Sequence, residues 1–209
     1  IAAISTAQIS HLSTAAIAAL TTAQAKALTT ASINALTSAQ VAAIETADLA
    51  VLSTAQLNKL GTAQLAQLTS VQVTALTSAQ LKSLSSDQVA ALTSAQLNAL
   101  TSAQLPSLSS AQVRALSTDQ VSKLTTTQIV GLSTAQVAAL STGQVASLTS
   151  VQINAMASDD LKALTTAQVR ALTSDQLSKL SSDQIALMAT DDIAAISTAQ
   201  ISHLSTAAI

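Results

Sequence analysis

Aromatic side chains are absent from this 209-residue sequence, and only 9% of its residues are charged. The net charge is −2, and no run of basic residues occurs. Nucleic-acid binding needs a positively charged surface, and single strands also stack on aromatic rings. The sequence therefore predicts no nucleic-acid partner.

Cysteine is also absent, proline occurs once, and glycine occurs at three positions. Disulfides and thiolate metal sites are thereby excluded. Apolar residues make up 49% of the chain, but no apolar run is long enough to cross a bilayer, so we expect no membrane span. With no linker rich in proline or glycine, we expect one continuous domain over residues 1–209.

What the sequence has in abundance is an eight-residue repeat, here called the octad, which runs from Ile4 without a gap. Residues 92–99, LTSAQLNA, are a representative copy, and we number its positions 1 to 8 from Leu92. Position 1 is Leu, Ile or Met, position 3 is always Ser or Thr, position 5 is nearly always Gln, and position 6 is aliphatic except at Ala25. A strict short period of this kind is the signature of a repeat architecture.

The hydroxyl at position 2 and the Gln at position 5 have the spacing of a helix capping box. The apolar residues at positions 1 and 6 have the spacing of a hydrophobic staple. All eight basic residues lie at positions 7 or 8, and all ten acidic residues lie at positions 2, 4 or 5, which is the polarity that a helix dipole favours. The pattern predicts one short helix in each octad.

Two other folds, a single long helix and a β-solenoid, fit the octad pattern less well than short helices do. In a single long helix, each octad would be rotated by about 80° from the last, so no apolar stripe would persist, and Pro106 would break the helix. In a β-solenoid, positions 1 and 6 would lie on opposite faces of a strand. We therefore predict an all-α solenoid of very short capped helices that are stabilised by stacking, with the β-solenoid as the alternative.

Residues 1–17 recur unchanged as residues 193–209, an offset of 192 residues. This recurrence predicts a long repeat and suggests that the chain is a window of a longer array. The end octads are as regular as the central ones and lack the polar caps that close a solenoid. Losses of Gln at position 5 and of the hydroxyl at position 2 fall only in even-numbered octads, which suggests a sixteen-residue unit.

Few residues are candidates for a site. His11 and His203 occupy the same place in the long repeat, and each reads as a surface side chain without partner ligands. Asp159–Asp160 and Asp191–Asp192 are paired carboxylates 32 residues apart. They would stack and could bind calcium only if the solenoid closed a turn over that distance; otherwise they are acids at helix N-termini.

No nucleophile–base pair, phosphate loop or metal-ligand spacing occurs, so we expect no enzyme, no catalytic, cofactor-binding or metal site, and no cofactor. The Ser/Thr pairs at positions 2 and 3 would form rows of hydroxyls that contact ice, glycans or another surface. Position 3 has no clear structural reason to be invariant.

Tracts such as LTTAQVRALTSDQL and LSTAQVAALSTGQV resemble the long repeat arrays of giant bacterial surface proteins, which are described as haem-utilisation or adhesion proteins. The resemblance implies an extracellular or cell-surface location and a structural or adhesive role. We expect a segment of a bacterial filament, stalk or sheath that continues in the same chain or self-associates. The alternative is an adhesin or a surface-binding module with a hydroxyl face that contacts glycan or ice.

Overall fold

The computed structural model describes residues 5–204, and the elements within them are 24 short α-helices and one 3₁₀-helix, with no strand. The prediction of an all-α fold with one short helix per octad is confirmed. The β-solenoid alternative is wrong for the described residues. The chain consists of two compact units, residues 1–108 and residues 109–209.

Unit 1 contains thirteen of these elements in chain order: α1 (Thr6–Ile9), α2 (Thr14–Ala18), α3 (Thr22–Lys26), α4 (Thr30–Asn34), α5 (Ser38–Ala42), α6 (Thr46–Val51), α7 (Thr54–Leu57), α8 (Thr62–Leu65), α9 (Ser70–Ala75), α10 (Ser78–Ser83), α11 (Ser86–Ala90), α12 (Ser94–Ala99) and η1 (Leu105–Ser107).

Unit 2 contains the other twelve: α13 (Ser110–Ala115), α14 (Thr118–Ser122), α15 (Thr126–Val130), α16 (Thr134–Ala139), α17 (Thr142–Ser147), α18 (Ser150–Ala155), α19 (Ser158–Lys162), α20 (Thr166–Arg170), α21 (Ser174–Ser178), α22 (Ser182–Ala186), α23 (Thr190–Ala195) and α24 (Thr198–Ile201).

Each α-helix begins at octad position 3, because position 2 is its N-cap. In α5 the backbone N–H of Gln40 donates to the Thr37 hydroxyl at 3.2 Å, and the backbone N–H of Thr37 donates to the Gln40 side-chain oxygen at 2.8 Å. Such a reciprocal pair satisfies two of the N–H groups that a helix start leaves without partners. The predicted capping box is therefore confirmed at α5, and it recurs in most of the helices.

The corner between two helices consists of two extended residues at positions 1 and 2. Leu76 has φ −67° and ψ 138°, and the N-cap Thr77 that follows has φ −72° and ψ 156°. No residue in the described range has a positive φ. Because ordinary residues adopt these angles freely, the corners require no glycine. The chain can therefore turn after every helix although it contains only three glycines.

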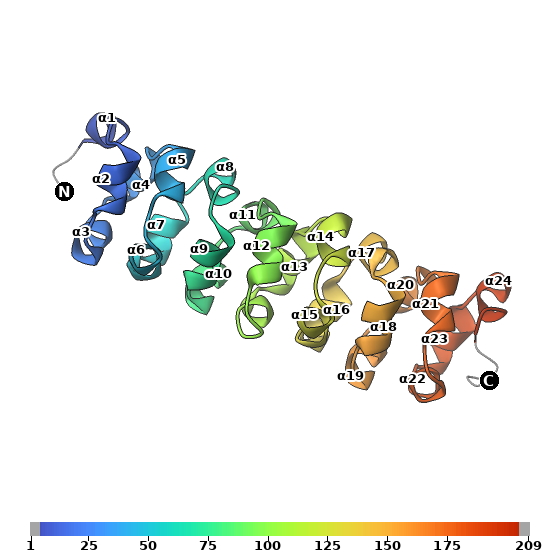
Figure 1. Ribbon diagram of the computed structural model, residues 1–209. Coiled ribbons are helices and arrows are strands. Elements are labelled where there is room, and N and C mark those ends of the chain that lie inside the picture. The colour runs from blue at the N-terminus through green and yellow to red at the C-terminus, as the bar shows by residue number, and fades with distance from the viewer. Residues whose placement is uncertain (1–4, 205–209) are drawn as a thin grey trace. The chain divides into compact units, whose positions relative to one another are not determined.

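Helices stack on those three octads away. In unit 1, α1 contacts α4, α2 contacts α5, α3 contacts α6, and the series continues to α9 with α12 and α10 with η1. In unit 2 the series runs from α13 with α16 to α21 with α24 (Figure 1). Each unit is thus a three-sided helical solenoid with 24 residues per turn, and the sixteen-residue rhythm of the substitutions has no counterpart in this stacking.

The core of each unit is built from positions 1 and 6. Position 6 residues such as Leu49 and Leu97 are fully buried, and position 1 residues such as Leu52 and Leu100 are nearly so. Position 6 of one octad and position 1 of the next lie three residues apart along the chain. They therefore share one face at the end of each short helix, and both point inward. Positions 2 to 4 line the outside of each turn, with the hydroxyls among them.

Candidate functional site

The Gln at position 5 is the polar residue that links one turn to the next. The Gln40 side chain is 2% exposed, and its amide nitrogen donates to the carbonyl oxygens of Ile9 and Leu12, both at 2.8 Å. These acceptors lie 31 and 28 residues earlier, at the corner where α1 ends. The oxygen of the same amide caps α5, so one side chain holds the start of one helix and the end of another.

The same arrangement recurs along both units. In unit 1, Gln80 donates to the carbonyls of Leu49 at 2.9 Å and Leu52 at 2.8 Å. In unit 2, Gln176 donates to those of Val145 at 2.9 Å and Leu148 at 2.6 Å. We call this series of inter-turn hydrogen bonds the glutamine ladder. The ladder satisfies two sets of polar groups at once. The Gln amide nitrogens donate to carbonyl oxygens that a helix end leaves without partners, and the buried Gln side chains gain acceptors for their own N–H groups.

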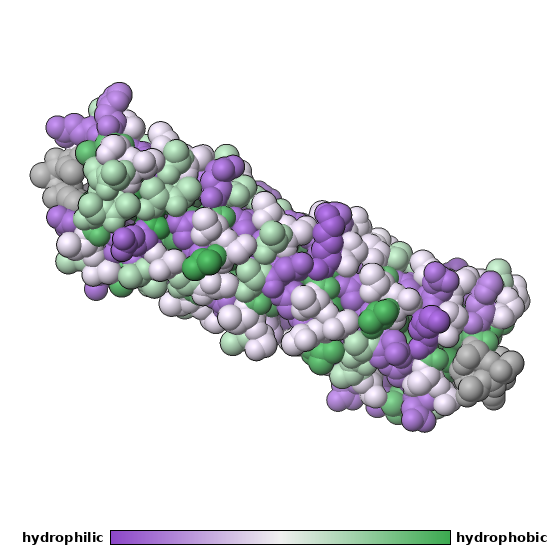
Figure 2. Space-filling model, in the orientation of Figure 1, coloured by the Kyte–Doolittle hydropathy of each residue, from purple (hydrophilic) through white to green (hydrophobic). Residues whose placement is uncertain are grey.

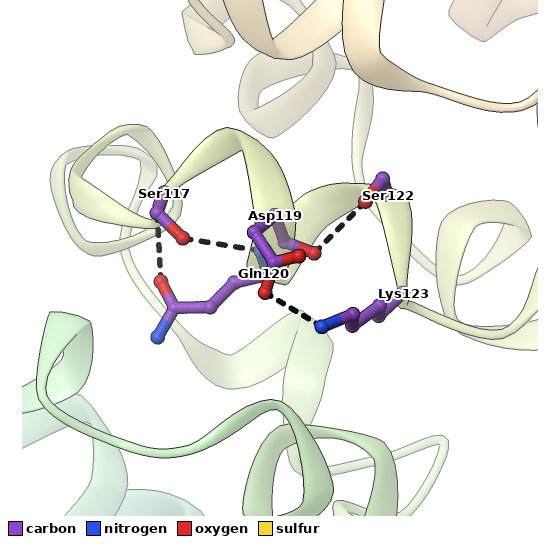
Figure 3. A network of polar contacts seen from close by, with 5 residues as sticks. All are labelled: Ser117, Asp119, Gln120, Ser122 and Lys123. Carbon is purple, nitrogen blue, oxygen red and sulfur yellow. Dashed lines mark hydrogen bonds and ion pairs between the residues drawn. The ribbon is translucent and has the colours of Figure 1, made fainter.

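The polar network at α14 shows how charge is added outside the ladder (Figure 3). The Ser117 backbone N–H donates to the Gln120 side-chain oxygen at 2.7 Å, and the Ser117 hydroxyl accepts from the Gln120 backbone N–H. The Asp119 carboxylate points away from this pair and accepts from the Lys123 ammonium at 2.9 Å. Both charged side chains are more than half exposed, so the ion pair contributes little to stability.

The two histidines lie on the surface. His11 and His203 are both exposed at octad position 8, as expected from the sequence. No group of three or more His, Cys, Asp or Glu side chains in residues 5–204 is arranged to hold a metal ion.

The paired carboxylates do not stack on each other, because a turn closes over 24 residues and the two pairs are 32 apart. Asp159 is exposed, and its carboxylate lies 3.9 Å from the Lys162 ammonium. Asp160 is buried at position 5, and desolvation followed by the charge of Asp159 raises the pKa of its carboxyl above the usual value. The condition that would have made these pairs a calcium site is therefore not met.

Asp48 is a second acid that stands in the place of a ladder Gln and has a raised carboxyl pKa. Its side chain is 2% exposed, and its Oδ2 atom has no hydrogen-bond partner. Burial, and to a lesser extent the charge of Glu45, raises the pKa of this carboxyl. Asp48 was not predicted as a site, although its octad differs from the repeat at both capping-box positions, with Glu45 at position 2 and Asp48 at position 5.

The outer surface of the described residues carries a groove of about 410 Å³ near Gly61. Its lining includes Asn58, Thr62, Ser83 and Asp87, and the Ser83 hydroxyl donates to the Asn58 side chain at 3.2 Å across the turn. Hydrophobic and hydrophilic residues are interspersed on the face that Figure 2 shows. None of the helices in the described residues has the length and apolar character to cross a membrane.

Comparison with known families agrees with the octad architecture. A family model, the ALTTAQ repeat, matches residues 1–38, 41–78, 73–102, 94–126, 122–150 and 153–190, which together cover most of the chain. The chain belongs to the ALTTAQ repeat family. The predicted membership of an octad-repeat family is thereby confirmed, and no curated protein matches this ALTTAQ repeat chain.

Sequence reasoning missed one half of the role of the ladder Gln. The capping box explains the amide oxygen but leaves two N–H donors without partners. A signal was present, because Glu completes a capping box as well as Gln does, yet Glu never occurs at position 5.

Proposed function

We propose that this ALTTAQ repeat chain is a structural protein, a segment of an extracellular bacterial filament, stalk or sheath. Its turns would supply length and stiffness rather than chemistry. Its partners would be further turns of the same kind, either as continuation of the chain or as other copies that self-associate. The expectation that it is not an enzyme stays a prediction.

The observation that carries this proposal is the two-sided character of every turn. One side of a turn presents glutamine N–H donors, as Gln80 does, and the other presents corner carbonyls, such as that of Leu52. The two sides complement each other but differ, so turns join head to tail. Head-to-tail contacts that do not close into a ring generate open linear assemblies.

The extracellular and bacterial part of the proposal rests on the resemblance of the octads to the repeat arrays of giant surface proteins. The core also favours a long assembly, because each turn buries only small aliphatic side chains and depends on its neighbours. Stability in such arrays is the sum of many similar turn-to-turn contacts, so it accumulates with length.

Electron microscopy of native material tests the proposal. We expect long, unbranched filaments whose power spectrum shows an axial repeat that corresponds to one 24-residue turn. Analytical ultracentrifugation of the purified 209-residue chain, over a range of concentrations, measures whether separate copies associate. Globular particles in native material, with no filament or stalk, would contradict the structural role.

A second candidate function, contact with glycans, is favoured by the groove lined by Asn58, Thr62, Ser83 and Asp87. Hydroxyl, amide and carboxylate groups are the usual hydrogen-bonding partners of sugar hydroxyls. A glycan array probed with the chain tests it, with Asp87→Ala as the variant. Binding that Asp87→Ala abolishes would support an adhesin, whereas an array without signal would remove this candidate.

A further inference from the structure

One octad of unit 1 carries a carboxylate at both capping-box positions. Glu45 is the N-cap of α6 and makes no side-chain cap, and Asp48 stands where the ladder Gln usually lies. The Asp48 side chain is 2% exposed, and its Oδ2 atom has no partner. A buried ionised carboxylate without a partner is very costly, so this group has to be neutralised by a proton or compensated by a bound cation.

The neighbouring octads indicate what Asp48 faces. Gln40 and Gln56, one octad before and one after, direct their amide nitrogens at the corner carbonyl 28 residues earlier, at 2.8 and 2.6 Å. Gln40 also reaches the carbonyl 31 residues earlier. By the same register, Asp48 faces the carbonyl oxygens of Leu20 and Ile17, and α6 does pack on α3, which begins just after Leu20.

The chemistry of this corner is reversed relative to the ladder. A carboxylate cannot donate to a carbonyl, and the Asp side chain is one methylene shorter than Gln. The corner therefore places oxygen acceptors on both sides. The Ile17 carbonyl accepts from the Leu20 backbone N–H at 3.2 Å, and no donor within residues 5–204 reaches the Leu20 carbonyl.

We propose that the carboxylates of Glu45 and Asp48 and the carbonyl oxygens of Ile17 and Leu20 form a calcium site between two successive turns of unit 1. The bound ion takes the place of the glutamine NH₂ group and joins the two turns through its positive charge. Ca²⁺ accepts six to eight oxygen ligands in irregular geometry, with water completing the shell, whereas Mg²⁺ needs a near-ideal octahedron. The site is independent of the structural role proposed above.

The other octads with Asp at position 5 provide an internal comparison. Asp160 and Asp192 follow N-caps Ala157 and Ala189, so their octads have no carboxylate in the place of Glu45. The side chains of both remain buried, but neither has an oxygen that is both fully buried and without a partner. The calcium site is therefore confined to the Glu45–Asp48 octad, and Asp160 serves as the matched control.

Isothermal titration of the chelator-treated 209-residue chain with calcium chloride tests the site. We expect one ion per chain with a Kd on the order of 10⁻⁴ to 10⁻³ M, as in extracellular calcium modules, and weaker binding of magnesium. Asp48→Asn and Glu45→Gln should each weaken calcium binding by a factor of about ten or more, since each removes a charged ligand. Asp160→Asn should leave the Kd unchanged.

Circular dichroism of each variant tests whether it is folded. If Asp48→Asn does not fold, Glu45→Gln still tests the site, because Glu45 is exposed and its substitution leaves the core unchanged. The melting temperature should rise with calcium in the parent chain and in Asp160→Asn, but much less in Glu45→Gln. The inference is overturned if the parent chain binds no calcium at about 10 mM, roughly ten times the weakest Kd expected. Undiminished binding by Glu45→Gln, or equal loss in Asp160→Asn, also overturns it.

Discussion

Two octads of unit 1 depart from the pattern in opposite ways. The octad of residues 100–107 contains Pro106, and in place of an α-helix it forms a turn followed by η1. It nevertheless keeps its ladder, because Gln104 donates to the carbonyls of Thr74 at 2.9 Å and Leu76 at 2.7 Å. The octad of residues 44–51 keeps its helix, α6, but has lost the ladder through Asp48.

The comparison shows that the local helix and the inter-turn ladder are separable. Pro106 lacks the N–H that would continue the helix, yet the Gln104 side chain still reaches the corner below. Both octads keep a fully buried position 6, Leu105 in one and Leu49 in the other. The core is thus common to both octads, the ladder fixes which turns are neighbours, and helix geometry at a given octad is the most dispensable of the three.

The largest effect is expected from breaking what the two octads share. Leu105→Ala and Leu49→Ala should each lower the free energy of unfolding by about 2–5 kcal/mol, because each leaves a cavity in a tightly packed core. Urea unfolding followed by circular dichroism measures both. Val71→Ala, at a side chain that is 68% exposed, is the control and should change little. A large difference between the two Leu variants would show that the octads do not have a common core.

The next effect is expected from removing the ladder where it survives without a helix. Gln104→Met keeps the size of the side chain but leaves the Thr74 and Leu76 carbonyls without their donor, at a cost of about 1–3 kcal/mol. Gln24→Met is the matched control, because Gln24 is exposed and its side chain makes only the local cap bond to Thr21. Equal destabilisation of the two variants would mean that capping, and not the ladder, explains Gln.

A smaller gain is expected from restoring the ladder where it is missing. Asp48→Gln combined with Glu45→Thr rebuilds the capping box and aims an amide at the Leu20 corner. Measured with chelator at neutral pH, the double variant should be more stable by at least about 1–2 kcal/mol, because each new hydrogen bond contributes about 0.5–1.5 kcal/mol. Asp87→Asn, at an exposed position 4, should change stability by less than about 0.5 kcal/mol. No gain in the double variant would contradict the register assigned to Asp48.

The smallest effect is a pH dependence at Asp160, which replaces a ladder Gln in unit 2. Burial, and to a lesser extent the charge of Asp159, raises the pKa of its carboxyl in the folded chain above the ordinary value of an aspartate. The folded chain then binds more protons than the unfolded chain between the two pKa values, so this group adds stability at low pH that is lost as pH rises through the folded pKa. Thermal melts should show a smaller slope in Asp160→Asn than in the parent chain, because Asp48, whose pKa is also raised by burial, contributes the same dependence in both. An identical pH profile in both would contradict the assignment.

The parts of the fold that were predictable are those that a single octad encodes. Helix start, helix polarity and the inward positions 1 and 6 follow from capping, charge placement and spacing within eight residues. The number of octads per turn was not predictable, because it depends on contacts 28 and 31 residues apart, such as Gln80 with Leu52 and Leu49. For the same reason the burial of Asp48 became visible only when its corner partners were known.

Disulfide trapping tests the three-octad turn most directly, and the absence of cysteine gives it a clean background. The Cγ2 atom of Thr118 lies 3.7 Å from the place that a Cβ of residue 143 would occupy, so the side chains of these two positions are in van der Waals contact across neighbouring turns. The account predicts rapid intramolecular oxidation of the Thr118→Cys/Gly143→Cys variant. It predicts none for Thr118→Cys paired with Ala135→Cys or Val151→Cys, which test turns of two and four octads. Oxidation of either of these pairs in preference to the first would contradict a 24-residue turn and the glutamine ladder with it.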